Sequence, residues 1–127
     1  MIKQIKSSEI TNYIKENSNV VLLDVRTENE WTTLGKPNAE DLNSKTYFIT
    51  VSPDLTKWQE PDPNFVENVK KEISTDKEIV VMCAAGGRSQ LAAMLLTKEG
   101  FKAHNLSDGF SGNGVDPGWK AAGLPTS

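Results

Sequence analysis

EIVVMCAAGGRS, residues 78–89, joins a buried strand to a helix and places the only cysteine of the chain, Cys83, between them. Residues 79–82 are apolar at consecutive positions, which is typical of a strand that is buried on both faces. From Arg88 onward the apolar residues recur at helical spacing, and Gly100 predicts the end of that helix. Cys83 is therefore expected in a strand-to-helix loop.

Similar strand and helix signals lie on both sides of this segment. Residues 20–25, VVLLDV, form another apolar run and predict a second buried strand. Three more helices are expected: one from Ser7 or Ser8 to about Asn17, one from Asp62 and Pro63 through Ile73, and a last one after a glycine-containing turn over 108–114. Two more strands are expected, over 47–51, where Pro53 ends the strand, and over 103–106. Residues 28–34 are expected to form a short helix or turn, and residues 35–45 a polar loop. Buried strands that alternate with helices imply an α/β fold whose parallel sheet has helices on both faces. Asp24 and Cys83 each follow or end a buried strand, so we expect them at one rim of the sheet.

The composition predicts one folded domain over residues 1–127. Acidic and basic residues are interspersed and the net charge is −3, so we expect no nucleic-acid partner and no membrane partner. The first residues lack the apolar run of a secretory signal, which favours a cytoplasmic protein. One cysteine and one histidine cannot make an internal disulfide or a cysteine-rich zinc site, and we expect no metal and no cofactor.

The loop after Cys83 has the composition of an anion-binding loop. Its small residues, with Gly86 and Gly87 in succession, allow consecutive backbone N–H groups to turn inward. The positive end of the following helix and the charge of Arg88 both favour a thiolate over a thiol. A lone cysteine at a strand end is commonly an inert buried residue, but an inert cysteine needs neither the glycine pair nor the arginine. The pattern therefore favours a reactive cysteine.

Three motifs resemble the rhodanese family: CAAGGRS over 83–89, LDVR over 23–26 with Glu30-Trp31 after it, and GWKAAGLP over 118–125. The resemblance implies a three-layer α/β/α domain with a central, mostly parallel sheet of about five strands. It implies that Cys83 is the catalytic nucleophile that carries a persulfide, and that Asp24 and Arg26 brace the rim of the site. The residues that it implies in substrate binding are Ala84, Ala85, Gly86, Gly87, Arg88 and Ser89, with Arg88 on the anionic group of the donor.

The expected activity is therefore transfer of sulfane sulfur from a small anionic donor such as thiosulfate to cyanide or a thiol acceptor, a thiol protein included. Two alternatives stay open. The first is a non-catalytic binding or regulatory module of the same fold. The second is a phosphatase or arsenate reductase, whose loops resemble this one but have one residue more between cysteine and arginine than the four found here. The chain also departs from the family pattern at residues 35–39, GKPNA, and has Ala84 where the family often has arginine.

Other polar and aromatic residues have simpler interpretations. Asp24 is expected to make a structural hydrogen bond, and Arg26 to pair with Glu30 or Glu28. Trp58 lies in a loop that follows a predicted strand, and such a loop can close over a site at the rim. For Trp31 and Trp119, packing is the expected role. His104 has no acidic or cysteine companion nearby in the sequence, so a general-base role for it is poorly motivated.

Overall fold

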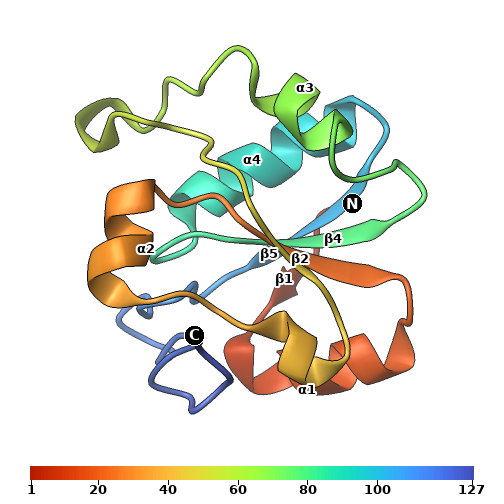
Figure 1. Cartoon of the computed structure of the whole chain (residues 1–127), viewed down its shortest axis with the longest axis vertical. Helices are drawn as coiled ribbons and strands as arrows, with labels where there is room; N and C mark the ends of the chain where they lie inside the picture. The colour runs from red at the N-terminus through yellow and green to blue at the C-terminus, as the bar shows by residue number, and fades with distance from the viewer.

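Five parallel strands form the centre of the molecule in the order β1-β5-β4-β2-β3. The computed structural model describes residues 1–127, and its ribbon is drawn in Figure 1. The strands are β1 Gln4–Ile5, β2 Val20–Asp24, β3 Thr46–Phe48, β4 Glu78–Met82 and β5 Lys102–Leu106. The predicted α/β fold with a parallel central sheet is confirmed.

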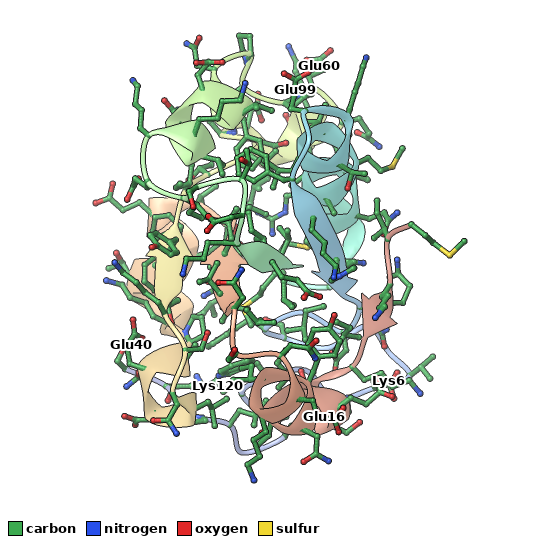
Figure 2. The ribbon with its side chains drawn as sticks, turned by 90° about the vertical axis from the view of Figure 1, so that its right-hand side faces the viewer. Lys6, Glu16, Glu40, Glu60, Glu99 and Lys120 are labelled. Carbon is green, nitrogen blue, oxygen red and sulfur yellow. The ribbon has the colours of Figure 1, made fainter.

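Helices cover both faces of this sheet. They are α1 Ser7–Glu16, α2 Glu28–Leu34, α3 Phe65–Lys70 and α4 Gly87–Lys98, with short 3₁₀ turns η1 Ala39–Leu42 and η2 Leu55–Lys57. Figure 1 shows α3 and α4 on one side of the sheet and α1 on the other, and Figure 2 shows the same layers after a rotation of 90°. None of these helices combines the length and the apolar composition that crossing a bilayer requires.

The two central strands bury side chains on alternate faces. Along β2, Val21 and Leu23 pack with α3 and α4, whereas Val20 and Leu22 pack with α1. Residues 79–82 of β4 alternate in the same way. Period-two alternation of this kind explains why consecutive positions are apolar, since both faces of the sheet are covered.

The register of the sheet brings the two expected site segments together. Asp24 pairs with Met82, the residue before Cys83, so both strands end at the same rim. This juxtaposition follows the rule that sites in parallel sheets lie beyond the carboxyl ends of the strands.

Several element boundaries differ from the expected ones. The strand predicted over 47–51 is shorter because β3 lies at the sheet edge, where its ladder with β2 ends at the pair Asp24–Phe48. The helix predicted from Asp62 begins only at Phe65, because the Asp62 carboxylate accepts the N–H of Asn64 in a preceding turn. The strand β1 was missed, since two residues carry no detectable pattern.

The predicted last helix is not formed. Residues 119–122 make turns between Gly118 and Gly123, whose φ angles are +88° and +81°. Left-handed φ angles interrupt a right-handed helix on both sides of this short segment. Trp119 is nevertheless fully buried under the sheet, and its indole N–H donates to the carbonyl of Pro125 at 2.7 Å. The segment closes the α1 side of the core without helical structure.

Candidate active site

Cys83 lies directly after β4, with its sulfur held inside the loop that leads to α4. Its Sγ accepts the backbone N–H of Gly86 at 3.1 Å and lies 3.2 Å from Ser89 Oγ. Gly86 turns the chain with φ +104°, and a Cβ there would collide with the carbonyl oxygen of Ser107. Only glycine fits this position, because the turn is left-handed and the Ser107 carbonyl leaves no room for a side chain.

A second segment supports the loop from behind. The N–H of Phe110 donates to the Cys83 carbonyl at 2.8 Å, and the N–H of Ser111 donates to the Ala84 carbonyl at 2.9 Å. Gly109 lies so close that a Cβ on it would stand 2.6 Å from the Cys83 carbonyl oxygen. The Gly109–Ser111 segment, which lies in the part of the chain expected only as a turn, therefore fixes the direction of the loop carbonyls.

Ser89 connects the sulfur to β5. Its Oγ donates to Asn105 Oδ1 at 2.6 Å, and Asn105 Nδ2 in turn donates to the Gly86 carbonyl at 3.2 Å and to Gln4 Oε1 at 2.8 Å. Because Asn105 donates through its nitrogen to two oxygens, its own oxygen must face Ser89. Ser89 Oγ is then free to accept the thiol proton of Cys83, and after ionisation its single hydrogen can turn from Asn105 to the sulfur.

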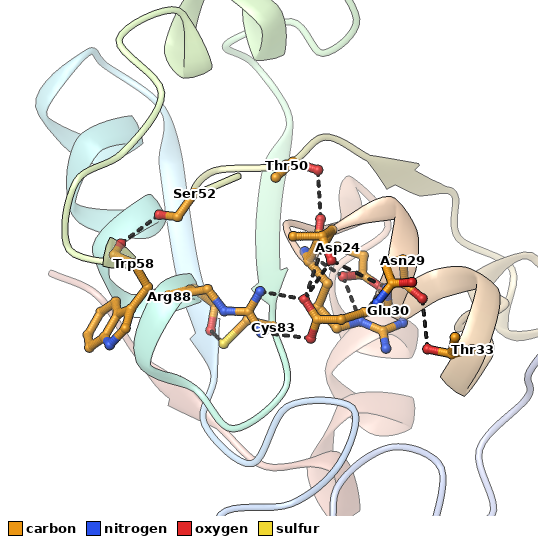
Figure 3. Close-up of polar contacts among 12 residues, drawn as sticks. Asp24, Asn29, Glu30, Thr33, Thr50, Ser52, Trp58, Cys83 and Arg88 are labelled. Atoms are coloured by element: carbon orange, nitrogen blue, oxygen red, sulfur yellow. Dashed lines mark hydrogen bonds and ion pairs between the residues drawn. The ribbon is translucent and has the colours of Figure 1, made fainter. Parts of the chain in front are cut away.

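Arg88 is bound to Glu30 through both ends of its guanidinium. The two hydrogen bonds measure 2.7 Å and 2.9 Å, and both side chains are largely buried. Burial acts to raise the pKa of Glu30, but the donors of Arg88 and Thr27 outweigh it and hold that pKa below 4.5. Glu30 is therefore ionised at neutral pH and balances the charge of Arg88 (Figure 3).

The expected pairing of Arg26 with Glu30 or Glu28 is wrong. Arg26 pairs with Asp24 instead, at 2.9 Å, with both side chains fully buried, and its guanidinium stacks on Phe110 at 4.1 Å from the ring centroid. Glu30 binds Arg88 instead, through both of its carboxylate oxygens. Burial raises the pKa of Asp24, and the hydrogen bonds from Arg26 limit the rise.

The Asp24–Arg26 pair connects structural parts and does not contact Cys83. Arg26 also donates to the Gly35 carbonyl at 2.8 Å, and its own carbonyl accepts the hydroxyl of Thr50 at 2.8 Å. The pair thus joins the end of β2 to the end of α2 and to the segment after β3. This geometry fits the supporting role that was expected for both residues.

An open pocket of about 300 Å³ lies over Cys83. Its lining residues are Leu55, Trp58, Cys83, Ala84, Ala85, Gly87 and Arg88. Only 1% of Cys83 is exposed, so the residue forms part of the pocket floor without protruding into it. The Trp58 ring lies 3.5 Å from where a Cβ on Gly87 would stand, and the Trp58 carbonyl accepts the Ser52 hydroxyl at 2.6 Å. Trp58 therefore lies at the site, as its loop position allowed, whereas Trp31 packs edge-on against Phe48.

His104 belongs to a separate polar cluster. Its Nε2 lies 2.8 Å from Glu78 Oε2, which also accepts the Tyr13 hydroxyl, and its Nδ1 accepts the backbone N–H of Lys3 at 3.2 Å. Glu78 begins β4, whereas Cys83 follows the other end of that strand. The histidine is not brought to the cysteine. No group of three or more His, Cys, Asp or Glu side chains is arranged to hold a metal ion.

Comparison with known proteins places this arrangement in a family. The family model for the rhodanese-like domain matches residues 8–113. An uncharacterized protein of Rickettsia prowazekii is 37% identical over 98% of this chain and 97% of its own length.

Two solved structures share the fold at greater distance. The crystal structure of Rv0390 from M. tuberculosis has a TM-score of 0.82 at 27% identity and covers 98% of this chain and 96% of that one. A Rhodopseudomonas palustris protein of unknown function, named a possible tyrosine phosphatase, has a TM-score of 0.63 at 27% identity, covering 99% and 85%. With the family model matched over most of the chain and the cysteine loop in place, this protein belongs to the rhodanese-like domain family.

Proposed function

We propose that this protein transfers sulfane sulfur through a persulfide on Cys83. The observation that carries the proposal is the position of Sγ, which accepts the Gly86 N–H at the start of α4 and lies under an open pocket. A helix N-terminus and a backbone N–H both stabilise negative charge on the sulfur. They would also stabilise the negative charge that returns to the Cys83 sulfur when its persulfide is discharged.

The reaction has two displacement steps. In the first, the Cys83 thiolate attacks the outer sulfur of an anionic donor such as thiosulfate, the S–S bond of the donor breaks, and sulfite leaves with the electron pair. In the second, cyanide or a thiolate attacks the outer sulfur of the Cys83 persulfide and releases the Cys83 thiolate. No net oxidation occurs, and the chain needs no second cysteine. Thiol acceptors are abundant in a reducing cytoplasm, which is the setting that we propose.

Arg88 contributes orientation more than net charge in this scheme. Only two of the five N–H groups of a guanidinium are used on Glu30, so others remain to meet donor oxygens in the pocket that Arg88 lines. The backbone from Ala84 to Ser89 would hold the transferred sulfur, as proposed for this loop. Because Glu30 balances the charge, we expect binding of a small dianion to be weak.

Loop length favours sulfur transfer over phosphoryl chemistry. Four residues separate Cys83 from Arg88, and a shorter loop encloses one sulfur atom more closely than a tetrahedral phosphoryl group. A non-catalytic module would not require a pocket that reaches the cysteine. We therefore rank both alternatives below the sulfurtransferase.

Thiosulfate:cyanide transfer tests the proposal directly. Thiocyanate formation should be measurable for the wild-type protein and fall to the uncatalysed rate in Cys83→Ser, because no other thiol exists in the chain. Hydrolysis of p-nitrophenyl phosphate should stay at background in both. Undiminished transfer by Cys83→Ser would remove the mechanism, and phosphate release that depends on Cys83 would favour the phosphatase.

A further inference from the structure

The pocket over Cys83 has an apolar wall that the first displacement step does not use. Leu55 and Trp58 come from the segment between β3 and α3 and line the pocket together with the loop residues Ala84 and Ala85. The volume of about 300 Å³ lies at the lower end of the range of roughly 300–1,000 Å³ that is usual for small-molecule pockets. A pocket of this size has room for an organic substituent beside the reacting sulfur.

Leu55 is exposed although it is a large hydrophobic side chain. It is 46% exposed and is the residue of this kind that borders the cysteine, since the others, Met1, Leu34, Met94 and Val115, line no part of that pocket. Figure 3 shows Trp58 on one side of Arg88 and Glu30 on the other, with Cys83 beside the guanidinium. An exposed leucine next to a tryptophan over a reactive atom offers contact area to an apolar group.

The segment that carries Leu55 is held in place by its own hydrogen bonds. Asp54 caps the η2 turn by accepting the N–H of Thr56 at 3.0 Å. Ser52 binds the Trp58 carbonyl, and the N–H of Asp62 donates to the Val51 carbonyl at 2.8 Å, which closes the base of the segment. The apolar wall is thus presented by an ordered turn.

The charge around the pocket disfavours an anionic partner with a bulky substituent. Arg88 is the charged residue that lines the pocket, and Glu30 balances it with two hydrogen bonds. The segment over residues 53–62 carries Asp54, Glu60 and Asp62 against a single Lys57. These carboxylates lie outside the lining of the pocket, and within the lining a carboxylate on the partner would find no unbalanced cation.

We propose that the natural sulfur acceptor is a thiol with an uncharged, apolar substituent, alkyl or aromatic, that lies against Leu55 and Trp58. This inference rests on the proposed function. The acceptor loses its proton to solvent, and its thiolate attacks the protonated outer sulfur of the Cys83 persulfide. The new S–S bond forms as the old one breaks, the acceptor leaves as a persulfide that carries the proton, and Cys83 recovers its thiolate. Leu55 and Trp58 determine acceptor specificity in this step.

A matched pair of acceptors tests the proposal. Cys83 is loaded with inorganic polysulfide, so that the test does not depend on how thiosulfate binds, and discharge of the persulfide is followed by mass spectrometry. Benzyl thiol should discharge it about tenfold faster than 4-carboxybenzyl thiol at equal thiolate concentration, because the charge is the main difference between them. Equal rates, or a faster reaction of the carboxylate, would overturn the inference.

A substitution of Leu55 tests whether the apolar wall causes the preference for the neutral thiol. Leu55→Lys should reduce the rate ratio of the neutral to the anionic thiol by about tenfold, because it replaces an apolar contact with a cation. Met94→Lys is the control, since Met94 is also exposed but lies on α4 outside the pocket, and its ratio should match the wild type. An unchanged rate ratio in Leu55→Lys would contradict the proposal that the acceptor lies against Leu55.

The two proposals fail in different ways. A persulfide that forms and discharges to cyanide without preference for the neutral thiol contradicts only the acceptor assignment. A Cys83 that takes up no sulfur even from polysulfide contradicts sulfur transfer itself and the acceptor assignment with it.

Discussion

At the scale of single residues, the role of Arg88 depends on Glu30. The arginine was expected to supply a free charge to the sulfur and to an anionic donor, and the structure pairs it with a carboxylate from α2 instead. A paired guanidinium still orients a ligand through its remaining N–H groups, but its long-range attraction for anions is small. Glu30 therefore controls how strongly the site attracts a dianion.

Replacing Glu30 by glutamine should tighten thiosulfate binding. Glu30→Gln leaves the charge of Arg88 unbalanced next to the pocket, so KM for thiosulfate in the cyanide assay should fall by about tenfold, which corresponds to about 1.4 kcal/mol. Glu28→Gln is the matched control, because Glu28 is an exposed carboxylate on the same helix. A raised KM in Glu30→Gln, with Glu28→Gln unchanged, would mean that Glu30 serves mainly to position Arg88.

At the scale of elements, the cysteine loop is a joint product of three segments. β4 delivers Cys83 to the rim, α4 begins inside the loop, and the Gly109–Ser111 segment after β5 binds its carbonyls from behind. The site therefore depends on a contact that is remote in sequence from the cysteine. Gly109 is the point where that contact is closest.

A methyl group at Gly109 should damage the loop. Gly109→Ala adds a Cβ against the carbonyls of Cys83 and Ala84, so we expect a loss of about 3 kcal/mol in the free energy of unfolding together with slower persulfide formation. Gly123→Ala is the control: its φ is also positive, at +81°, but a Cβ there meets nothing within 4 Å. That variant should lose only about 1 kcal/mol, from backbone strain. Urea unfolding measures the free energy of unfolding of the two variants. Equal losses of this free energy in Gly109→Ala and Gly123→Ala would contradict a steric role for Gly109.

The elements that the sequence predicted best are those buried on both faces. The apolar runs of β2 and β4 have one interpretation only, and the Cys83 loop between β4 and α4 follows from them. The boundary of β3 depends on where its ladder with β2 ends, which is a tertiary event, whereas α3 begins late because Asp62 binds the N–H of Asn64 in a local turn. The residues missed at the site depend, like the end of β3, on tertiary contacts. Asn105 carries a weak signal, a polar residue inside a buried strand, whereas the partner of Arg88 could not be chosen among several acidic residues.

At the scale of the whole molecule, a polar cluster joins the start of the chain to three elements at the end of the sheet away from Cys83. Tyr13 on α1, Glu78 on β4 and His104 on β5 share one network, and the backbone of Lys3 donates to the histidine. Burial lowers the pKa of His104, and Lys3 and Lys102 lower it further against the effect of Glu78. The folded protein thus holds this histidine in its neutral form.

Stability should fall when His104 is forced to take up a proton. A folded pKa below the ordinary 6.5 means that the unfolded chain binds the proton more readily, so the contribution of His104 is fully present above pH 6.5 and is lost as the pH falls through that region. The urea midpoint of the wild type should therefore decrease between pH 7 and about pH 5.5. His104→Asn should be less stable at pH 7, but its urea midpoint should change less with pH. A parallel decline of both proteins would assign the pH dependence to other groups.

Sulfur transfer by this protein requires that Cys83 takes up one sulfur atom. The most direct measurement is the intact mass of the protein after incubation with thiosulfate in the absence of reducing agent, followed by peptide mapping. We predict a gain of one sulfur, located on Cys83, absent from Cys83→Ser and removed by cyanide. An unchanged mass for the wild type under conditions where the protein is folded would contradict sulfur transfer through Cys83.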